Sequence, residues 1–360
     1  MGGNQARRLP RLGARAVYLA VVAPGVGRLP AALSYRMACW RGDWHFRRQA
    51  GKRTEMARNL RLVLGDELSP AAAQQVTREW FRLASCGPVD VMRLRRGTQS
   101  LQRLVEIRGQ GHLAAALAAG KGAIVCTGHL RCASSFSVLH ASGFPVTSIG
   151  REWPRYDTGL SSAERWLWER YLRPVRRYRQ RPNIEPWPGR PQVAALAAAA
   201  LRANEVVTIT IDAPPMDSDR ARATETPFLG RQARLLPGAV TLAQLTGAPL
   251  LMGIVHRAAD YRHQVLQISA PVPMDGDIET VFRRCAAEVS AAIRRSPASW
   301  GFWPETGDLV AMGLIPPPRD GSPAAGAVPR PPGRLLQHDG SPDSVPARDR
   351  PVPGARTQRL

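Results

Sequence analysis

The chain lacks a long apolar run, although 44% of its 360 residues are hydrophobic. A membrane-spanning helix needs about 18–20 consecutive apolar residues, and no stretch reaches that length. The most apolar N-terminal segment, Ala16 to Val26, is interrupted by Pro24 and Gly25. Arginine-rich sequence continues on both sides of it without a clear cleavage site, which argues against a cleaved signal peptide. The sequence therefore predicts neither a transmembrane helix nor a removed leader.

Cysteine is scarce, and lysine is almost absent. The five cysteines are odd in number and scattered, which favours free thiols in a reducing compartment over a disulfide framework. Only Lys52 and Lys121 are lysines, yet 50 basic residues face 28 acidic ones, and the net charge is +22. Such a chain is attracted to phospholipid head groups, nucleic acids or an acidic carrier protein. Since no nucleic-acid-binding motif is present, we expect a membrane surface or a carrier protein and no nucleic acid.

Several catalytic and metal-binding motifs are also missing. The chain has no Gly-x-Ser-x-Gly elbow, no P-loop and no His-Glu-x-x-His. The spacing Cys126-x2-His129-x2-Cys132 occurs in zinc sites, but a structural site normally needs a fourth ligand and no second local cluster supplies one. Asp217-Ser-Asp219 resembles a metal-binding Asp-x-Asp but lies in a Pro- and Arg-rich loop. We predict no metal site.

Short apolar runs alternate with amphipathic segments along the middle of the chain. Strands are expected at 123–127, 146–149, 205–211, 249–255 and 264–269, and helices at 70–86, 134–142, 161–173, 191–201 and 277–294. This alternation predicts an α/β fold, a single domain with a mostly parallel central sheet flanked by helices.

Composition divides the chain into three parts. Residues 1–60 are basic with interleaved apolar residues, including Trp40 and Trp44, and are expected to form helices at a membrane interface. A solvated basic helix packed on the core is the alternative. Residues 61–314 form the α/β domain. From 315 to 360 the chain is rich in Pro, Gly and charge, so we expect a disordered tail.

The run Gly122-Ala-Ile-Val-Cys-Thr-Gly-His129 places a histidine just beyond a predicted strand. Ligands bind at that edge of open α/β sheets, and a histidine there can act as a general base near neutral pH. His129 is therefore the leading catalytic candidate.

Several ordered blocks extend over roughly residues 15–305 and include Arg108-Gly-Gln-Gly-His-Leu113, the run ending at His129, Gly143 to Arg151, Glu205 to Asp212, Leu236-Pro-Gly-Ala239 and Ser296-Pro-Ala-Ser-Trp300. In these blocks the chain resembles the bacterial lipid A biosynthesis (lauroyl/myristoyl) acyltransferases, whose relatives include phosphatidylinositol mannoside acyltransferases. The family's catalytic pattern is His-x4-Asp/Glu. Here Ser134 stands where that pattern has the carboxylate, and Leu130-Arg-Cys-Ala133 lacks the usual Gly-Asn-Trp character.

The resemblance implies acyl transfer from acyl-CoA or acyl carrier protein to a hydroxyl of a lipid or glycolipid, with no bound cofactor. His129 would be the base. Ser134 could orient its imidazole but could not balance its charge, and Asp212, at the end of a neighbouring strand, is the candidate supporting carboxylate. Arg151 and Arg257 follow predicted strands and would bind anionic substrate groups.

Two other hypotheses stay open. Because Ser134 replaces a carboxylate, the chain could be an inactive homologue that binds a lipid or a partner protein. It could also be a peripheral membrane adaptor that acts through residues 1–60. For the enzyme we expect a peripheral or monotopic place on the cytoplasmic face of the cell membrane.

Overall fold

The structure is a computed structural model, and it describes residue 18 and residues 22–131, 135–150, 161–186 and 192–317. Contacts group Met1–Pro329 into one compact unit and Arg330–Leu360 into a second. All described residues belong to the first unit. The greater part of the predicted disordered tail, from residue 318 onward, lies outside the described residues.

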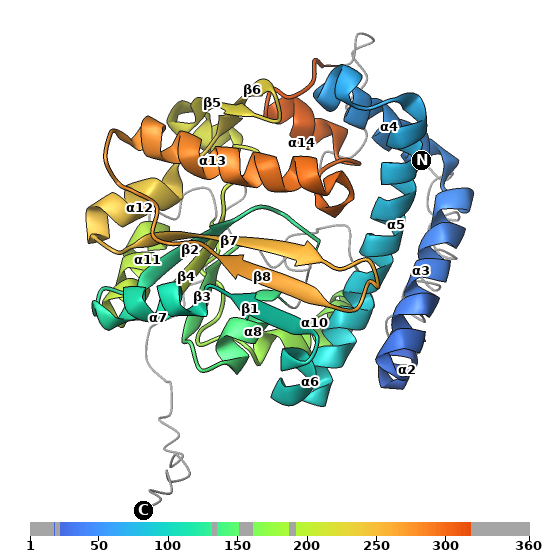
Figure 1. The fold of residues 1–360 in the computed structure, drawn as a ribbon, viewed down its shortest axis with the longest axis horizontal. Coiled ribbons are helices and arrows are strands. Elements are labelled where there is room, and N and C mark those ends of the chain that lie inside the picture. Colours follow the sequence, from blue (N-terminus) through green and yellow to red (C-terminus); the bar gives the residue numbers. More distant parts are fainter. Residues whose placement is uncertain (1–17, 19–21, 132–134, 151–160, 187–191, 318–360) are drawn as a thin grey trace, which may run out of the picture. The chain divides into compact units, whose positions relative to one another are not determined.

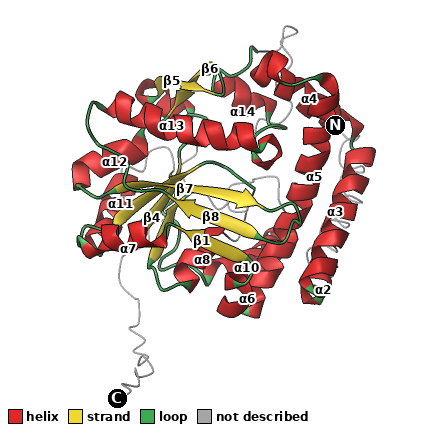
Figure 2. Cartoon of the chain, viewed as in Figure 1, coloured by secondary structure: helices red, strands yellow, loops and turns green. Residues whose placement is uncertain are grey.

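A six-stranded sheet forms the centre of the compact unit (Figure 2). Its order is β1-β8-β7-β2-β4-β3, and every neighbouring pair is parallel except β7 and β8. The sequence prediction of a mostly parallel sheet is confirmed. The strands are β1 (Val105–Arg108), β2 (Ala123–Thr127), β3 (Val146–Ile149), β4 (Val206–Thr210), β7 (Leu250–Arg257) and β8 (Gln264–Ile268).

Strand β2 shows why the sheet is covered on both faces. All five of its residues are buried, as expected for a central parallel strand between two layers of helices. Ile124 and Cys126 join one core cluster, whereas Ala123 and Val125 join another, because alternate side chains leave a strand on opposite sides. The predicted α/β layering is confirmed.

Helices pack on each face of this sheet (Figure 1). One layer contains α11 (Gln192–Arg202), α12 (Gly238–Thr246) and α13 (Ile278–Arg295), and the other contains α7 (Gln110–Ala118) and α8 (Ser135–Ala141). A short antiparallel hairpin, β5 (Thr224–Phe228) and β6 (Arg231–Leu235), packs on α13. Of the smaller helices, α6 (Thr98–Gln102) packs on β1, and α10 (Ser162–Arg176) packs on the N-terminal part of the chain. Helix α14 (Thr306–Ala311) follows α13.

The N-terminal helices are joined to the core through α5 (Pro70–Arg93). Ser69 caps α5 by accepting a hydrogen bond from the backbone N–H of Ala72, and the helix runs past its internal Pro88. Helices α2 (Ala23–Arg28) and α3 (Ala31–Arg48) lie along α5 (Figure 1). A Cβ at Gly42 of α3 would come within 2.5 Å of the Cα of Arg82, so glycine permits this close approach.

Helix α4 (Ala50–Leu64) adds its buried face to the main core. Residues 31–64 thus pack directly against the α/β domain. At the other end, Leu314 and Ile315 are buried in the same core, so ordered packing continues at least to residue 315. No described helix combines the length and the apolar character needed to cross a bilayer.

Candidate active site

The register of two central strands brings His129 and Asp212 together. Strands β2 and β4 are parallel, and Thr127 pairs with Thr210 at their carboxyl ends. Two residues beyond these partners stand His129 and Asp212, so both side chains belong to one edge of the sheet. Ligands bind at this edge in open α/β folds. The predicted position of His129 just beyond the end of a strand is confirmed.

Asp212 holds both the ring and the backbone of His129. Its Oδ1 lies 2.6 Å from Nδ1 of His129, and its Oδ2 accepts the His129 backbone N–H over 2.8 Å. Oδ2 also accepts the indole N–H of Trp300, again over 2.8 Å. The Asp212 side chain is fully buried, whereas 38% of the His129 side chain is exposed. The carboxylate is therefore internal and the imidazole faces outward.

These contacts set the charge of the pair. Burial disfavours the charged form of each group, but the mutual attraction and the hydrogen bonds outweigh it. The pKa of Asp212 is lowered, and the pKa of His129 is raised. An ionised Asp212 accepts a hydrogen bond from the N–H at Nδ1, which leaves the lone pair of the neutral imidazole on Nε2. This tautomer is the one that a general base requires.

Comparison with known proteins identifies the family. The family model of the bacterial lipid A biosynthesis acyltransferases matches residues 1–157 and 171–303. The chain belongs to this family. A search of curated proteins finds no match. The family consists of acyltransferases of lipid biosynthesis, so membership implies acyl transfer to a lipid-like acceptor.

The other residues that the sequence predicted for the active site have different outcomes. Ser134 and Arg151 lie outside the described residues. The structure does not bring Arg257 into the contacts described for His129 and Asp212. It stands at the end of β7, where its buried guanidinium forms an ion pair with Asp90 and donates to the carbonyl of Tyr261 over 2.6 Å.

The segment 299–302 supports the candidate site around His129 and was not predicted to do so. The backbone N–H of Gly301 donates to the carbonyl of His129 over 2.9 Å, and that of Arg131 donates to the carbonyl of Ser299 over 2.7 Å. The Phe302 ring packs edge-on against the imidazole, with 4.7 Å between ring centroids. The sequence indicated this segment only through its Ser296-Pro-Ala-Ser-Trp300 block, and those residue types do not predict contact with Asp212 or His129.

Metal ligands do not gather in the described part of the chain. Its residues contain no group of three or more His, Cys, Asp and Glu side chains placed to hold a metal ion. Of the spacing that resembles a zinc motif, Cys126 is a buried thiol inside β2, and Cys132 lies outside the described residues. Burial raises the pKa of the Cys126 thiol, which disfavours the thiolate that zinc requires. Asp219 lies in a 3₁₀ helix, Asp217–Arg222.

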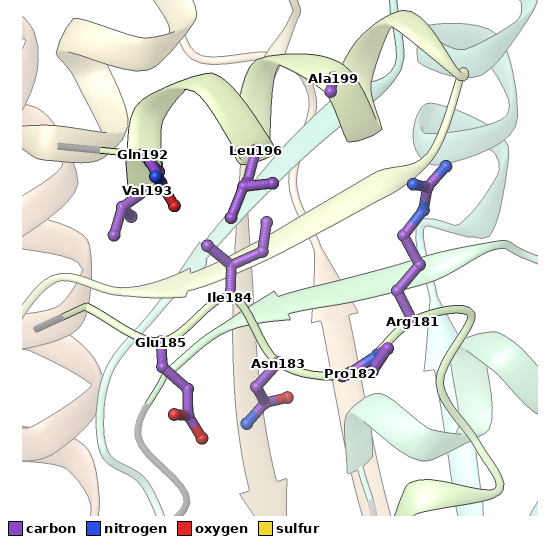
Figure 3. Close-up of a pocket in the computed structure, with 9 residues that line it drawn as sticks. All are labelled: Arg181, Pro182, Asn183, Ile184, Glu185, Gln192, Val193, Leu196 and Ala199. Carbon is purple, nitrogen blue, oxygen red and sulfur yellow. The ribbon is translucent and has the colours of Figure 1, made fainter. Parts of the chain in front are cut away.

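A separate cavity of about 360 Å³ lies between the segment 181–185 and helix α11. Figure 3 shows Ile184 and Leu196 facing each other across it, with Arg181 at one end. Arg181 forms an ion pair with the buried Glu205, with 2.6 Å between Nε and Oε1. Neither His129 nor Asp212 lines this cavity.

Proposed function

We propose that this acyltransferase moves an acyl group from a thioester, acyl-CoA or acyl carrier protein, to a hydroxyl of a lipid or glycolipid. His129 is the general base and Asp212 its supporting carboxylate. The observation that carries the proposal is the 2.6 Å contact between Nδ1 of His129 and Oδ1 of Asp212. Asp212, two residues beyond the end of β4, supplies the negative charge that Ser134 cannot supply from the family's usual position.

The chemistry follows from the orientation of the ring. Nε2 of His129 takes the proton of the acceptor hydroxyl while the oxygen attacks the thioester carbonyl. The tetrahedral intermediate then expels the thiolate, which receives that proton from the imidazolium. Asp212 stays ionised and stabilises the imidazolium, as the supporting carboxylate does in serine hydrolases. The proposed reaction draws on these side chains and on the substrates themselves.

The structure bears differently on Arg151 and Arg257, the two arginines predicted to bind anionic substrate groups. Arg151 remains the proposed clamp for a phosphate of the donor or an anionic group of the acceptor. The side chain of Arg257 is only 4% exposed, and its ion pair with Asp90 favours a structural role. Tyr35 adds a hydrogen bond to the same carboxylate over 2.7 Å, which strengthens that interpretation.

A surface on α3 supports the proposed contact with an anionic membrane. Leu33, Met37, Trp40 and Trp44 follow each other at spacings of four, three and four residues and are 40–72% exposed. This spacing places them on one side of the helix. Exposed arginines 36, 47 and 48 lie on the same helix. An apolar and aromatic stripe bordered by guanidinium groups suits the interface of a bilayer with anionic lipids.

The test is an assay of thioester consumption with purified protein, an acyl-CoA and a lipid acceptor. We expect His129→Ala to lower turnover by at least about 10²-fold, the lower end for loss of a general base. Asp212→Asn should cause a loss of similar or larger size, since an amide neither balances the imidazolium nor holds the required tautomer. Full activity of His129→Ala would refute the mechanism.

His263 and Asp260 provide a matched control. They form a second His–Asp pair with 2.6 Å between Nδ1 and Oδ2, but it lies in the turn between β7 and β8. His263→Ala and Asp260→Asn should leave turnover unchanged. A comparable loss in both pairs would show that the assay reports general damage to the fold.

Because a serine stands at position 134, the alternative function is that of an inactive lipid-binding homologue. Ser134→Glu separates the possibilities. If Asp212 supports His129, a second carboxylate should help little or should hinder through like-charge repulsion. A large gain would show that Ser134 is a weak orienter in the family's usual position. An inactive homologue should show no transfer with either residue and no change in ligand binding when His129 is replaced.

A further inference from the structure

Two basic side chains lie over the ring of Trp80, close to the candidate active site. The guanidinium carbon of Arg131 is 3.9 Å from the ring centroid, and Nζ of Lys52 is 5.0 Å from it. Trp80 is only 4% exposed and donates its indole N–H to the carbonyl of Trp300 over 3.0 Å. The ring is therefore a fixed platform, on which cations are held by attraction to its π face.

Arg131 is incompletely satisfied on this platform. Its Nε is buried, and no acceptor among the described residues reaches that atom. Its Nη2 has one long contact, 3.4 Å to the carbonyl of Gly301. Burial lowers the pKa of Arg131 to about 10 although Glu305 attracts its charge. A buried guanidinium with unused donors is costly unless a further partner is supplied.

The described carboxylates do not supply that partner at contact distance. None of them lies within 4.0 Å of the side-chain nitrogens of Arg131 or Lys52, although Glu305 attracts both. Burial also lowers the pKa of Lys52, and it raises the pKa of Glu305. The side chains of Arg131 and Lys52 thus form a partly buried basic site in which one more negative charge would be stabilised.

This place adjoins the reacting atoms. Arg131 follows His129 by only two residues, and a hydrogen bond of 2.7 Å from the Leu130 N–H to the Gly128 carbonyl closes a tight turn at His129. Both residues are held by the segment 299–302, His129 through Gly301 and Phe302 and Arg131 through Ser299. An anion bound by Arg131 would lie beside the substrate groups that meet His129.

We propose that Arg131, assisted by Lys52, binds a phosphate group of the substrate next to His129. The proposal rests on the acyl-transfer function proposed above. A planar guanidinium stacked on an aromatic ring presents its N–H fork to phosphate oxygens, and an ammonium adds a point charge. The phosphate could belong to the donor, since CoA and the carrier-protein prosthetic group both carry one, or to a phosphorylated lipid acceptor. The chemistry is the same for both sources, and the experiment distinguishes them.

The first test measures KM separately for the acyl-CoA and for the lipid acceptor. Arg131→Met keeps an unbranched side chain against Trp80 but removes every donor. We expect KM for the substrate that carries the phosphate to rise at least about tenfold, because a charge-assisted hydrogen bond is lost. A rise for acyl-CoA assigns the donor phosphate, and a rise for the lipid assigns the acceptor. Arg131→Lys should restore part of the affinity, and Lys52→Met should weaken binding of the same substrate.

The matched control is Arg170→Met. The guanidinium of Arg170 lies over the ring of Trp166, with 5.6 Å to the centroid, but both residues are exposed on α10. This variant should leave both KM values unchanged. If Arg131→Met and Lys52→Met lower the melting temperature but change neither KM, the cluster is structural and the inference is wrong.

A binding measurement separates this inference from the proposed function. Titration of free CoA, and of micelles of the lipid acceptor, into His129→Ala and into His129→Ala/Arg131→Met needs no turnover. Tighter binding of one ligand by the single variant supports the inference. Equal binding of both ligands overturns it. Undiminished transfer by His129→Ala would instead overturn the catalytic proposal, whatever the titration shows.

Discussion

The indole N–H of Trp300 donates to Oδ2 of Asp212 over 2.8 Å, on the carboxylate whose other oxygen meets the ring of His129. Trp300 is fully buried. A residue 88 positions away in the chain thus fixes the orientation of the supporting carboxylate. The hydrogen bond also favours the ionised form of Asp212, in which it balances an imidazolium.

Trp300→Phe should therefore affect the chemistry as well as the fold. Loss of one donor to a buried carboxylate costs about 1–3 kcal/mol, and we expect turnover to fall about tenfold. Trp303→Phe is the control, because Trp303 is equally buried and donates to the carbonyl of Pro297 over 2.6 Å. Urea unfolding should show destabilisation of both variants, while steady-state kinetics should show slower turnover only in Trp300→Phe. Equal kinetic losses would contradict a specific role for Trp300.

The raised pKa of His129 predicts the pH dependence of the rate. A general base must be neutral, so kcat/KM should rise with pH and reach half its maximum above pH 6.5. Asp212→Asn removes the charge that raises this pKa, and burial alone lowers it. The residual activity of that variant should therefore have its midpoint at a lower pH than the wild type. An unchanged midpoint would show that Asp212 does not govern the titration of His129.

The same pair predicts a pH dependence of stability. The folded-state pKa of His129 lies above its unfolded value near 6.5, so the stabilisation by its protonated form is complete below that pH. The stabilisation is lost as the pH rises through the folded-state value. Relative to His129→Gln, the wild type should have its largest advantage in free energy of unfolding near pH 5–6 and a smaller one near pH 9. Denaturant melts at both pH values measure this difference, and an advantage that grows with pH would contradict it.

Gly128 lies between the strand end and the proposed base, and space requires a glycine there. A Cβ at this position would come within 2.6 Å of Cγ1 of Val289 and 3.0 Å of Oδ2 of Asp212. Gly128→Ala should lower turnover at least tenfold and destabilise the fold by about 1–3 kcal/mol, as overpacking does. Gly111→Ala, in the first turn of α7, where the new Cβ meets no other element within 4 Å, should leave turnover intact and stabilise by up to about 1 kcal/mol. Unchanged turnover and stability of Gly128→Ala would show that the pair of His129 and Asp212 tolerates displacement.

The stripe on α3 predicts binding to vesicles of anionic phospholipid. Trp40→Ser with Trp44→Ser should weaken binding at least about tenfold, because each aromatic side chain contributes more than 1 kcal/mol of apolar burial. Leu245→Ser is the control, since Leu245 is 75% exposed but lies on α12. Added salt should weaken binding of the wild type. Binding in sedimentation assays that is indifferent to both salt and the tryptophans would contradict the assignment.

Local pattern predicted the central strands well. β2 and β3 begin and end as expected, because their apolar runs are bounded by glycine and proline. The sequence pattern did not predict a helix end and several strands that depend on tertiary packing. The predicted helix 70–86 continues to Arg93 through Pro88, because Val89, Val91 and Met92 bury their side chains beyond the proline. β1 was missed because only Val105 of its four residues is buried. β5 and β6 were missed because only two residues of each strand are buried.

The candidate site shows the same limit. Asp212 was a reasonable candidate because two parallel strands bring their carboxyl ends to one edge. Neither the hydrogen bond from Trp300 nor the stacking of Arg131 on Trp80 has a local signal. Each joins segments far apart in the chain, and Arg131 is one of 48 arginines.

The buried carboxylate of Asp90 has a mechanical consequence. It accepts hydrogen bonds from Tyr35 of α3, Arg257 of β7 and Gln264 of β8, so one carboxylate connects the outer helix to the sheet. Pulling α3 away would remove the phenol donor of Tyr35 from this buried carboxylate and leave only Arg257 and Gln264 bonded to it, and the loss of a donor to a buried charged group is costly. If α3 rests on a bilayer, the sheet moves with it as one piece. The proposed base His129 is then held at a fixed height above the lipid head groups, and the proposed acceptor would have to extend its hydroxyl to that height.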